Sequence, residues 1–160
     1  MKILFLHGLE SKPGGSKAKH LASAGFTVLN PALPRESFEE SITIAQKVID
    51  DEKPDLVVGS SRGGAVGMCV STRGAGLVLI APAWKRFVDD FRMNEFKIRV
   101  DCQNTIILHS DKDDIVLPKD SEHLSEVYGV KKVCVGQSHR MSDTEALEAL
   151  LDVTRWLITR

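Results

Sequence analysis

Six short apolar runs, separated by amphipathic stretches, limit this chain to a small number of folds. The runs are rich in Val, Ile and Leu, lack strict polar alternation, and fall at residues 3–6, 27–29, 56–58, 77–80, 105–108 and 132–135. Strands that are buried on both faces of a parallel sheet have this composition. Because strands and helical stretches alternate throughout, we predict an α/β fold, a three-layer αβα sandwich with helices on both faces of a parallel sheet.

Two helices can be placed with their start signals. Phe38, Ile42, Ala45 and Ile49 recur at helical spacing behind a capping box formed by Ser37 and Glu40. Ser142 and Glu145 form the same pattern ahead of the last helix. We expect the buried face of that helix to carry Ala146, Leu147, Leu150, Leu151, Val153 and Leu157.

Length and composition exclude several function classes. The 160 residues suit a single domain over 1–160, and a net charge of −1 argues against nucleic-acid or anionic-membrane partners. The three cysteines show no C-x-x-C spacing, which indicates buried thiols in a reducing compartment and no metal site. The apolar run at the start is too short for a signal peptide, and no run would cross a bilayer. We therefore expect a cytoplasmic protein.

The segment Gly59-Ser60-Ser61-Arg62-Gly63 follows one predicted strand and precedes a glycine-rich helical stretch. G-x-S-x-G between a strand and a helix is typical of a nucleophile elbow, a strained turn that exposes the serine hydroxyl. Glycines two residues before and after the serine allow the chain to pass close to itself. We predict Ser61 as a catalytic nucleophile and the backbone N–H of Arg62 as an oxyanion donor.

A serine nucleophile needs a general base, and position selects among the five histidines. His139 follows the last predicted strand, so it would lie at the same sheet edge as Ser61. His20 and His123 fall within helical stretches and suit packing or surface roles. His109 ends a strand, where we expect it to order the following turn.

The acid that orients His139 should come from the loop after residues 105–108. Asp111, Asp113 and Asp114 all lie in it, and their spacing alone does not separate them. The catalytic carboxylate must be shielded and aimed at the imidazole, while its neighbours can stay solvated. On that ground we favour Asp113.

The loop after the first strand begins His7-Gly8-Leu9. In enzymes with a nucleophile elbow, a loop in this place supplies the second oxyanion N–H, and we predict that Leu9 donates it. His7 suits a role in orienting the loop through a hydrogen bond. Gly14-Gly15-Ser16 lacks the lysine and the spacing of a phosphate-binding loop.

Four ordered motifs together resemble the α/β-hydrolase superfamily, and the small capless bacterial esterase-like members in particular: Leu6-His7-Gly8, Gly59-x-Ser61-x-Gly63, His109-Ser110-x-x-Asp113-x-x-Val116-x-Pro118 and Gly136-x-x-His139. The resemblance implies a Ser61–His139–Asp113 triad, no cofactor and no metal. It also implies a trimmed version of the superfamily fold, with six parallel strands in the order 2-1-3-4-5-6. Ser110 stands where the superfamily usually has glycine.

Two segments bear on the substrate. Arg62 occupies a place that often holds an apolar residue or histidine, so its cation would either favour an anionic substrate or form an ion pair at the rim, and we favour the rim. Residues 84–103 leave room only for a short lid without a large cap. There, Phe87, Phe91, Met93 and Phe96 would line an acyl pocket or pack as a helix between strands.

The predicted function is a carboxylesterase-like serine hydrolase that acts on small acyl esters through an acyl-enzyme. A thioesterase or amidase with the same triad, or a non-catalytic binding module, would have the same motifs, since pocket shape selects the leaving group. The predicted partner is a small acyl substrate. The sequence does not indicate an oligomeric state.

Overall fold

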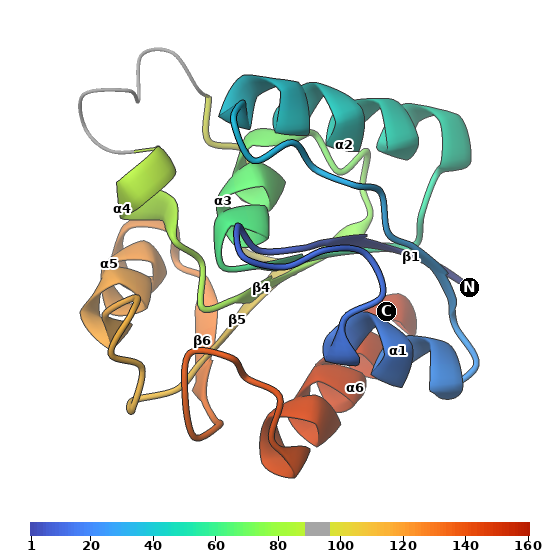
Figure 1. Ribbon diagram of the computed structural model, residues 1–160. Coiled ribbons are helices and arrows are strands. Elements are labelled where there is room, and N and C mark those ends of the chain that lie inside the picture. Colours follow the sequence, from blue (N-terminus) through green and yellow to red (C-terminus); the bar gives the residue numbers. More distant parts are fainter. Residues whose placement is uncertain (89–96) are drawn as a thin grey trace.

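The computed structural model describes residues 1–88 and 97–160, which form a three-layer α/β sandwich (Figure 1). Its parallel sheet has the strand order β2-β1-β3-β4-β5-β6, which confirms the predicted topology. The strands are β1 (Lys2–Leu6), β2 (Thr27–Leu29), β3 (Leu56–Ser60), β4 (Gly76–Ile80), β5 (Thr105–His109) and β6 (Lys131–Cys134). Because the strands are parallel, their carboxyl ends meet at one edge of the sheet.

Burial differs between the central and the edge strands. Every residue of β3, β4 and β5 is buried, as expected for strands covered on both faces. The edge strands β2 and β6 have no fully buried residue. The expectation of burial on both faces was wrong for β2 and β6. Each lies at an edge of the sheet, where it has a neighbouring strand on one side only and is less completely covered.

Helices cover both faces of the sheet. In Figure 1, α1 and α6 lie on one face, while α2 and α3 lie on the other. Each face has its own apolar core, and the second face also receives residues from α4 and α5. The helices are α1 (Ser16–Ser23), α2 (Phe38–Glu52), α3 (Arg62–Cys69), α4 (Trp84–Phe87), α5 (Pro118–Tyr128) and α6 (Thr144–Ile158).

One of the two predicted helix caps is correct. Ser37 Oγ accepts a hydrogen bond from the backbone N–H of Glu40 at 3.1 Å, at the start of α2. The cap of α6 is Asp143, whose carboxylate accepts from the N–H of Ala146 at 3.1 Å. The prediction of Ser142 was therefore wrong by one residue, because serine and aspartate cap helices about equally well and the spacing alone does not choose between them. The buried face of α6 consists of Ala146, Leu150, Thr154 and Leu157.

The cysteines only partly follow the prediction of burial. Cys69 is buried, and burial raises the pKa of its thiol to about 12. Cys102 and Cys134 are exposed, so the prediction was wrong for them. Among the described residues, no helix is both long enough and apolar enough to cross a bilayer.

Candidate active site

Ser61 occupies a strained turn between β3 and α3. Its backbone has φ +56° and ψ −116°, a conformation that a residue with a side chain rarely adopts. The carbonyl of Ser61 accepts hydrogen bonds from the N–H groups of Gly64, Ala65 and Ala83, which hold the turn closed. The strain places the serine at the carboxyl edge of the sheet, ahead of the first turn of α3.

Two glycines make this turn sterically feasible. A Cβ on Gly59 would lie 2.4 Å from the carbonyl oxygen of Gly63. A Cβ on Gly63 would lie 2.0 Å from the carbonyl oxygen of Leu6, on the neighbouring strand β1. Backbone atoms cannot be displaced as a side chain can, so both positions require glycine.

Three predicted side chains form one hydrogen-bonded line. Ser61 Oγ lies 3.0 Å from His139 Nε2, and His139 Nδ1 lies 2.7 Å from Asp113 Oδ2. Since a carboxylate only accepts, His139 Nδ1 carries the proton and Nε2 is free to accept from the serine hydroxyl. These are the distances and the tautomer that a serine nucleophile and its general base require.

Burial separates Asp113 from the neighbouring carboxylates. Asp113 is buried, whereas Asp111 and Asp114 are exposed. Oδ1 of Asp113 accepts from the backbone N–H groups of Ile115 and Val116, both at 2.9 Å. Burial alone would raise the pKa of Asp113, but the hydrogen bonds from His139 and from these N–H groups outweigh it and lower the pKa. Asp113 is thus held as a carboxylate.

A second imidazole, that of His109, lies behind this carboxylate. Its Nε2 is 2.9 Å from Asp113 Oδ2 and 3.0 Å from the carbonyl oxygen of Val116, so it must carry a proton. Its Nδ1 lies 2.6 Å from Ser121 Oγ, which donates to it. His109 is fully buried, and burial lowers its pKa although Asp113 acts in the opposite direction. It orders the turn that carries Asp113, as the sequence indicated, and it contacts the same oxygen of Asp113 as His139 does.

This burial predicts a dependence of stability on pH. The unfolded chain takes up a proton on His109 near the ordinary pKa of 6.5, while the folded chain resists protonation until a lower pH. The contribution of His109 to the free energy of unfolding is therefore complete above the unfolded-state pKa of 6.5. It decreases as the pH falls below 6.5 toward the lower pKa of the folded state. We expect the melting temperature of His109→Gln to fall less than that of the parent protein between about pH 6.5 and pH 5.

The matched control is His123→Gln, since His123 is an exposed histidine stacked on Trp84. In calorimetry at several pH values, the melting temperature of this variant should change with pH as steeply as that of the parent protein. If the melting temperature of His109→Gln also changed with pH as steeply as that of the parent protein, the assignment of a buried, neutral imidazole would be contradicted.

Ser110 ties the acid loop to the base loop. Its hydroxyl is fully buried and donates to the carbonyl oxygen of Gly136 at 2.8 Å, three residues before His139. It also accepts from the N–H of Lys112 at 3.1 Å. The departure from the superfamily's glycine therefore has a structural use. Sequence reasoning missed it, because the contact is made between segments 26 residues apart.

The loop after β1 lies against Ser61. A Cβ added to Gly8 would be 3.4 Å from Ser61 Cβ, and Leu9 lines the same cleft. His7 accepts from the N–H of Leu33 at 3.0 Å, so its other ring nitrogen donates to the carbonyl oxygen of Gly8 at 2.9 Å. His7 thus fixes the loop as expected.

Arg62 does not play either of the two side-chain roles considered for it. Its guanidinium is buried beneath α2 and donates to the carbonyl oxygen of Pro34 at 2.9 Å and to Ser41 Oγ at 3.1 Å. The rings of Phe38 and Phe87 flank it, with centroids 5.6 and 5.5 Å from Cζ. The rim ion pair was a wrong prediction, because the first turn of α3 directs this side chain away from the cleft. As the first residue of α3, Arg62 still has a backbone N–H without an intrahelical acceptor.

Of the four residues predicted to line an acyl pocket or pack as a helix, Phe87 lies in the described part of the chain. Phe87 stacks on Phe38 with ring centroids 5.4 Å apart, which places it in the core between α2 and α4. The prediction that it lines an acyl pocket is not supported, since it is absent from the cleft that contains Ser61. Phe91, Met93 and Phe96 lie outside the described residues.

A cleft of about 760 Å³ opens over Ser61 and His139. The loop after β1 and the start of α1 form one wall. Asp114 and Ile115 of the acid loop, with Arg140 after the base, form another. Ser61 and His139 are therefore partly accessible from solvent, while the side chain of Asp113 is fully buried.

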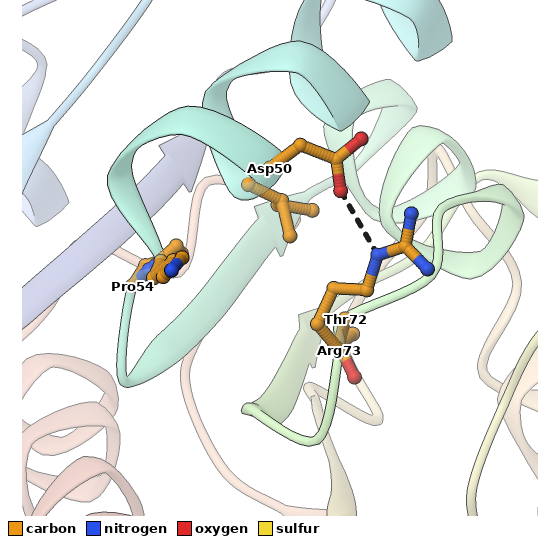
Figure 2. A pocket seen from close by; sticks show the side chains of 6 residues that line it. Asp50, Pro54, Thr72 and Arg73 are labelled. Atoms are coloured by element: carbon orange, nitrogen blue, oxygen red, sulfur yellow. Dashed lines mark hydrogen bonds and ion pairs between the residues drawn. The ribbon is translucent and has the colours of Figure 1, made fainter.

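A second cavity, of about 380 Å³, lies at the opposite edge of the sheet, where β3 and β4 begin. Figure 2 shows Asp50 and Arg73 facing each other across it, paired at 2.9 Å. Its lining contains no serine, histidine or cysteine. We therefore assign no chemistry to it.

Solved structures with a similar fold identify the fold of this chain. Est1E from Butyrivibrio proteoclasticus, with ferulic acid bound, has a TM-score of 0.77 at 16% identity, covering 99% of this chain and 90% of Est1E. The ydeN gene product from B. subtilis has a TM-score of 0.72 at 16% identity, covering 99% of both chains. Mouse alpha/beta hydrolase domain-containing protein 10 has a TM-score of 0.71 at 17% identity, covering 99% of this chain and 89% of that one. The chain has the α/β-hydrolase fold. No family model and no curated protein sequence matches it.

The α/β-hydrolase fold explains how distant residues meet. Ser61 follows β3, Asp113 follows β5 and His139 follows β6, so all three emerge at the carboxyl edge of the sheet. Their order along the chain, nucleophile then acid then histidine, is the order typical of α/β-hydrolases.

Proposed function

We propose that the protein is a serine hydrolase that cleaves small carboxylic esters through an acyl-enzyme. The observation that carries this proposal is the line from Ser61 Oγ through His139 to Asp113, with hydrogen bonds of 3.0 and 2.7 Å. With Nδ1 of His139 donating to Asp113, Nε2 is placed to accept the proton of the Ser61 hydroxyl.

In the first half of the reaction, His139 Nε2 removes the proton from Ser61 Oγ as the oxygen attacks the ester carbonyl. The carbonyl oxygen becomes an oxyanion, and the backbone N–H groups of Leu9 and Arg62 would stabilise it. The intermediate then collapses. The alcohol leaves with the proton that His139 held, and the acyl group remains bonded to Ser61.

In the second half, His139 removes a proton from a water molecule, whose oxygen attacks the acyl carbonyl. Collapse of the second intermediate releases the carboxylic acid and returns the proton to Ser61 Oγ. Asp113 keeps the imidazole in one orientation and stabilises its charged form, without being protonated itself. No step requires a cofactor or a metal.

Ester hydrolysis is the reaction best supported among the acyl transfers. The cleft is open, with Leu9 and the 69% exposed Ile115 as apolar contacts at its rim, which suits a small acyl group. Est1E, which shares the fold, has been solved with ferulic acid bound, and a carboxylic acid is the acyl product of ester, thioester and amide hydrolysis alike, so the leaving group has to be tested directly.

A substrate panel tests the leaving group. The purified protein is assayed with para-nitrophenyl acetate and butyrate, with an acyl-CoA thioester and with a para-nitroanilide of the same acyl length. We expect the highest kcat/KM for the oxygen esters. A higher value for the thioester or the anilide would overturn the ester assignment while leaving the triad in place.

A further inference from the structure

The cleft over Ser61 is lined by three cations, Lys17 from α1, Arg86 from α4 and Arg140 from the loop after His139. Among the described residues none of the three has a carboxylate within ion-pair distance. Unpaired cations that converge on a cleft from separate elements indicate an anionic ligand.

The carboxylates of the cleft do not neutralise these cations. Glu10 is already held by Arg35 in a two-pronged pair, with distances of 3.0 and 2.9 Å. Asp114 is exposed on the loop after β5, and among the described residues of the cleft lining it is the one carboxylate without a cationic partner. Cations therefore exceed available carboxylates in the lining.

Lys17 is the most constrained of the cations. It is half-buried, and its ammonium donates to the carbonyl oxygen of Arg140 at 2.5 Å. That contact uses one of its three donors. Burial, with the nearby charge of Arg140, lowers the pKa of Lys17 to about 8. Burial disfavours a charge here, yet the lysine lines the same cleft as Ser61, where a bound anion would stabilise it.

The surroundings suit a short ligand with one charged end. Ser11, Ser16 and Ser138 line the same cleft and offer hydroxyl donors near the cations. Leu9 and Ile115 offer apolar contact for a short carbon chain. A carboxylate accepts several hydrogen bonds at once, so it matches this set of donors.

We propose that the cleft selects esters that carry a carboxylate, which Lys17 and Arg140 bind while Ser61 attacks the ester carbonyl. The proposal rests on the serine hydrolase function proposed above and specifies its substrate class. Arg62, the cation that the sequence marked, takes no part in this selection, since its side chain is buried beneath α2.

Two pairs of chromogenic esters test the proposal. The first pair places the carboxylate on the acyl side: the mono-para-nitrophenyl ester of adipic acid and its neutral methyl-capped counterpart. The second pair places it on the leaving group: para-nitrophenyl acetate with and without a ring carboxylate. We expect kcat/KM for the charged ester to exceed that for the neutral ester about tenfold in at least one pair, and that pair identifies the charged side.

Substitutions in helix α1 test whether Lys17 causes the preference for the charged ester, measured as the ratio of the two kcat/KM values. Lys17→Met should reduce the ratio about tenfold, and Lys17→Arg should retain it. The matched control is Lys19→Met, because Lys19 is an exposed lysine on the same helix outside the cleft, and its ratio should equal that of the parent protein. Circular dichroism and melting curves establish that the variants are folded.

The pH dependence gives an independent readout. The kcat/KM ratio should fall as pH rises through about 8, where Lys17 loses its proton in the free enzyme, and should persist to higher pH in Lys17→Arg. A ratio near one in both pairs, or a ratio that Lys17→Met leaves unchanged, would overturn the proposal. Hydrolysis that survives Ser61→Ala would instead overturn the proposed function, so the two failures are distinguishable.

Discussion

Ser61→Ala should reduce kcat/KM for para-nitrophenyl acetate by about 10³- to 10⁶-fold. The substitution removes the only oxygen within hydrogen-bond distance of His139 Nε2 among the described residues, so no acyl-enzyme can form. The oxyanion donors and the binding contacts stay in place, and they account for the activity that remains. Initial rates measure the effect. They are taken on protein shown to be folded, with a mock purification as the control for contaminating esterases.

Ser60→Ala is the comparison that separates the nucleophile from its neighbour. Ser60 ends β3, lies in the same cleft and is one residue out of register for the motif. We expect this variant to keep at least about a tenth of the activity of the parent protein. Losses of equal size in both variants would show that the strained turn, and not the hydroxyl of Ser61, had been damaged.

Gly63→Ala should destabilise the fold by about 3 kcal/mol or more. The added methyl group would lie 2.0 Å from the carbonyl oxygen of Leu6, in the strand beside the nucleophile turn. Relief requires α3 to move off β1, and this movement breaks the close packing of helix and sheet. Urea denaturation gives the free energy of unfolding, and failure to accumulate as soluble protein would be the extreme form of the same result.

Gly67→Ala, in the same helix, should have the opposite or no effect. Its added methyl group would have Leu77 Cδ1 as nearest neighbour at 3.4 Å, an ordinary contact with a side chain. Alanine also favours the helix by up to about 1 kcal/mol. Equal destabilisation by both substitutions would mean that helix α3 simply tolerates no alanine, and that the contact with β1 is not the cause.

The α/β class was predictable from local patterns in the sequence, whereas the strand order was expected only from the resemblance to the α/β-hydrolase superfamily. Apolar runs, their order and the handedness of crossovers suffice to place Ser61 and His139 at one edge of the sheet. The cap of α6 was not predictable to the residue, since Ser142 and Asp143 are both good caps and only the geometry separates them.

The site was predictable as a set of residues but not as a set of interactions. Three carboxylates in one loop look alike in sequence, and what distinguishes Asp113 is burial together with donors from Ile115 and Val116. Burial of this kind depends on how distant segments pack.

The direction of a side chain from a tight turn was the least predictable feature. Arg62 stands beside the nucleophile in sequence, yet its guanidinium lies under α2, while Lys17 and Arg140 enter the cleft from segments 123 residues apart. In the proposal above, Lys17 and Arg140 bind the anionic group, and Arg62 does not.

Covalent labelling by a fluorophosphonate probe, followed by peptide mass spectrometry, tests the central claim most directly. Such a probe reacts with a serine only when a base activates it and donors stabilise the charge that develops. We expect a single phosphonylated peptide with the modification on Ser61, lost in Ser61→Ala and strongly slowed in His139→Ala. Folded protein that stays unlabelled, or that is labelled at another serine, would contradict it.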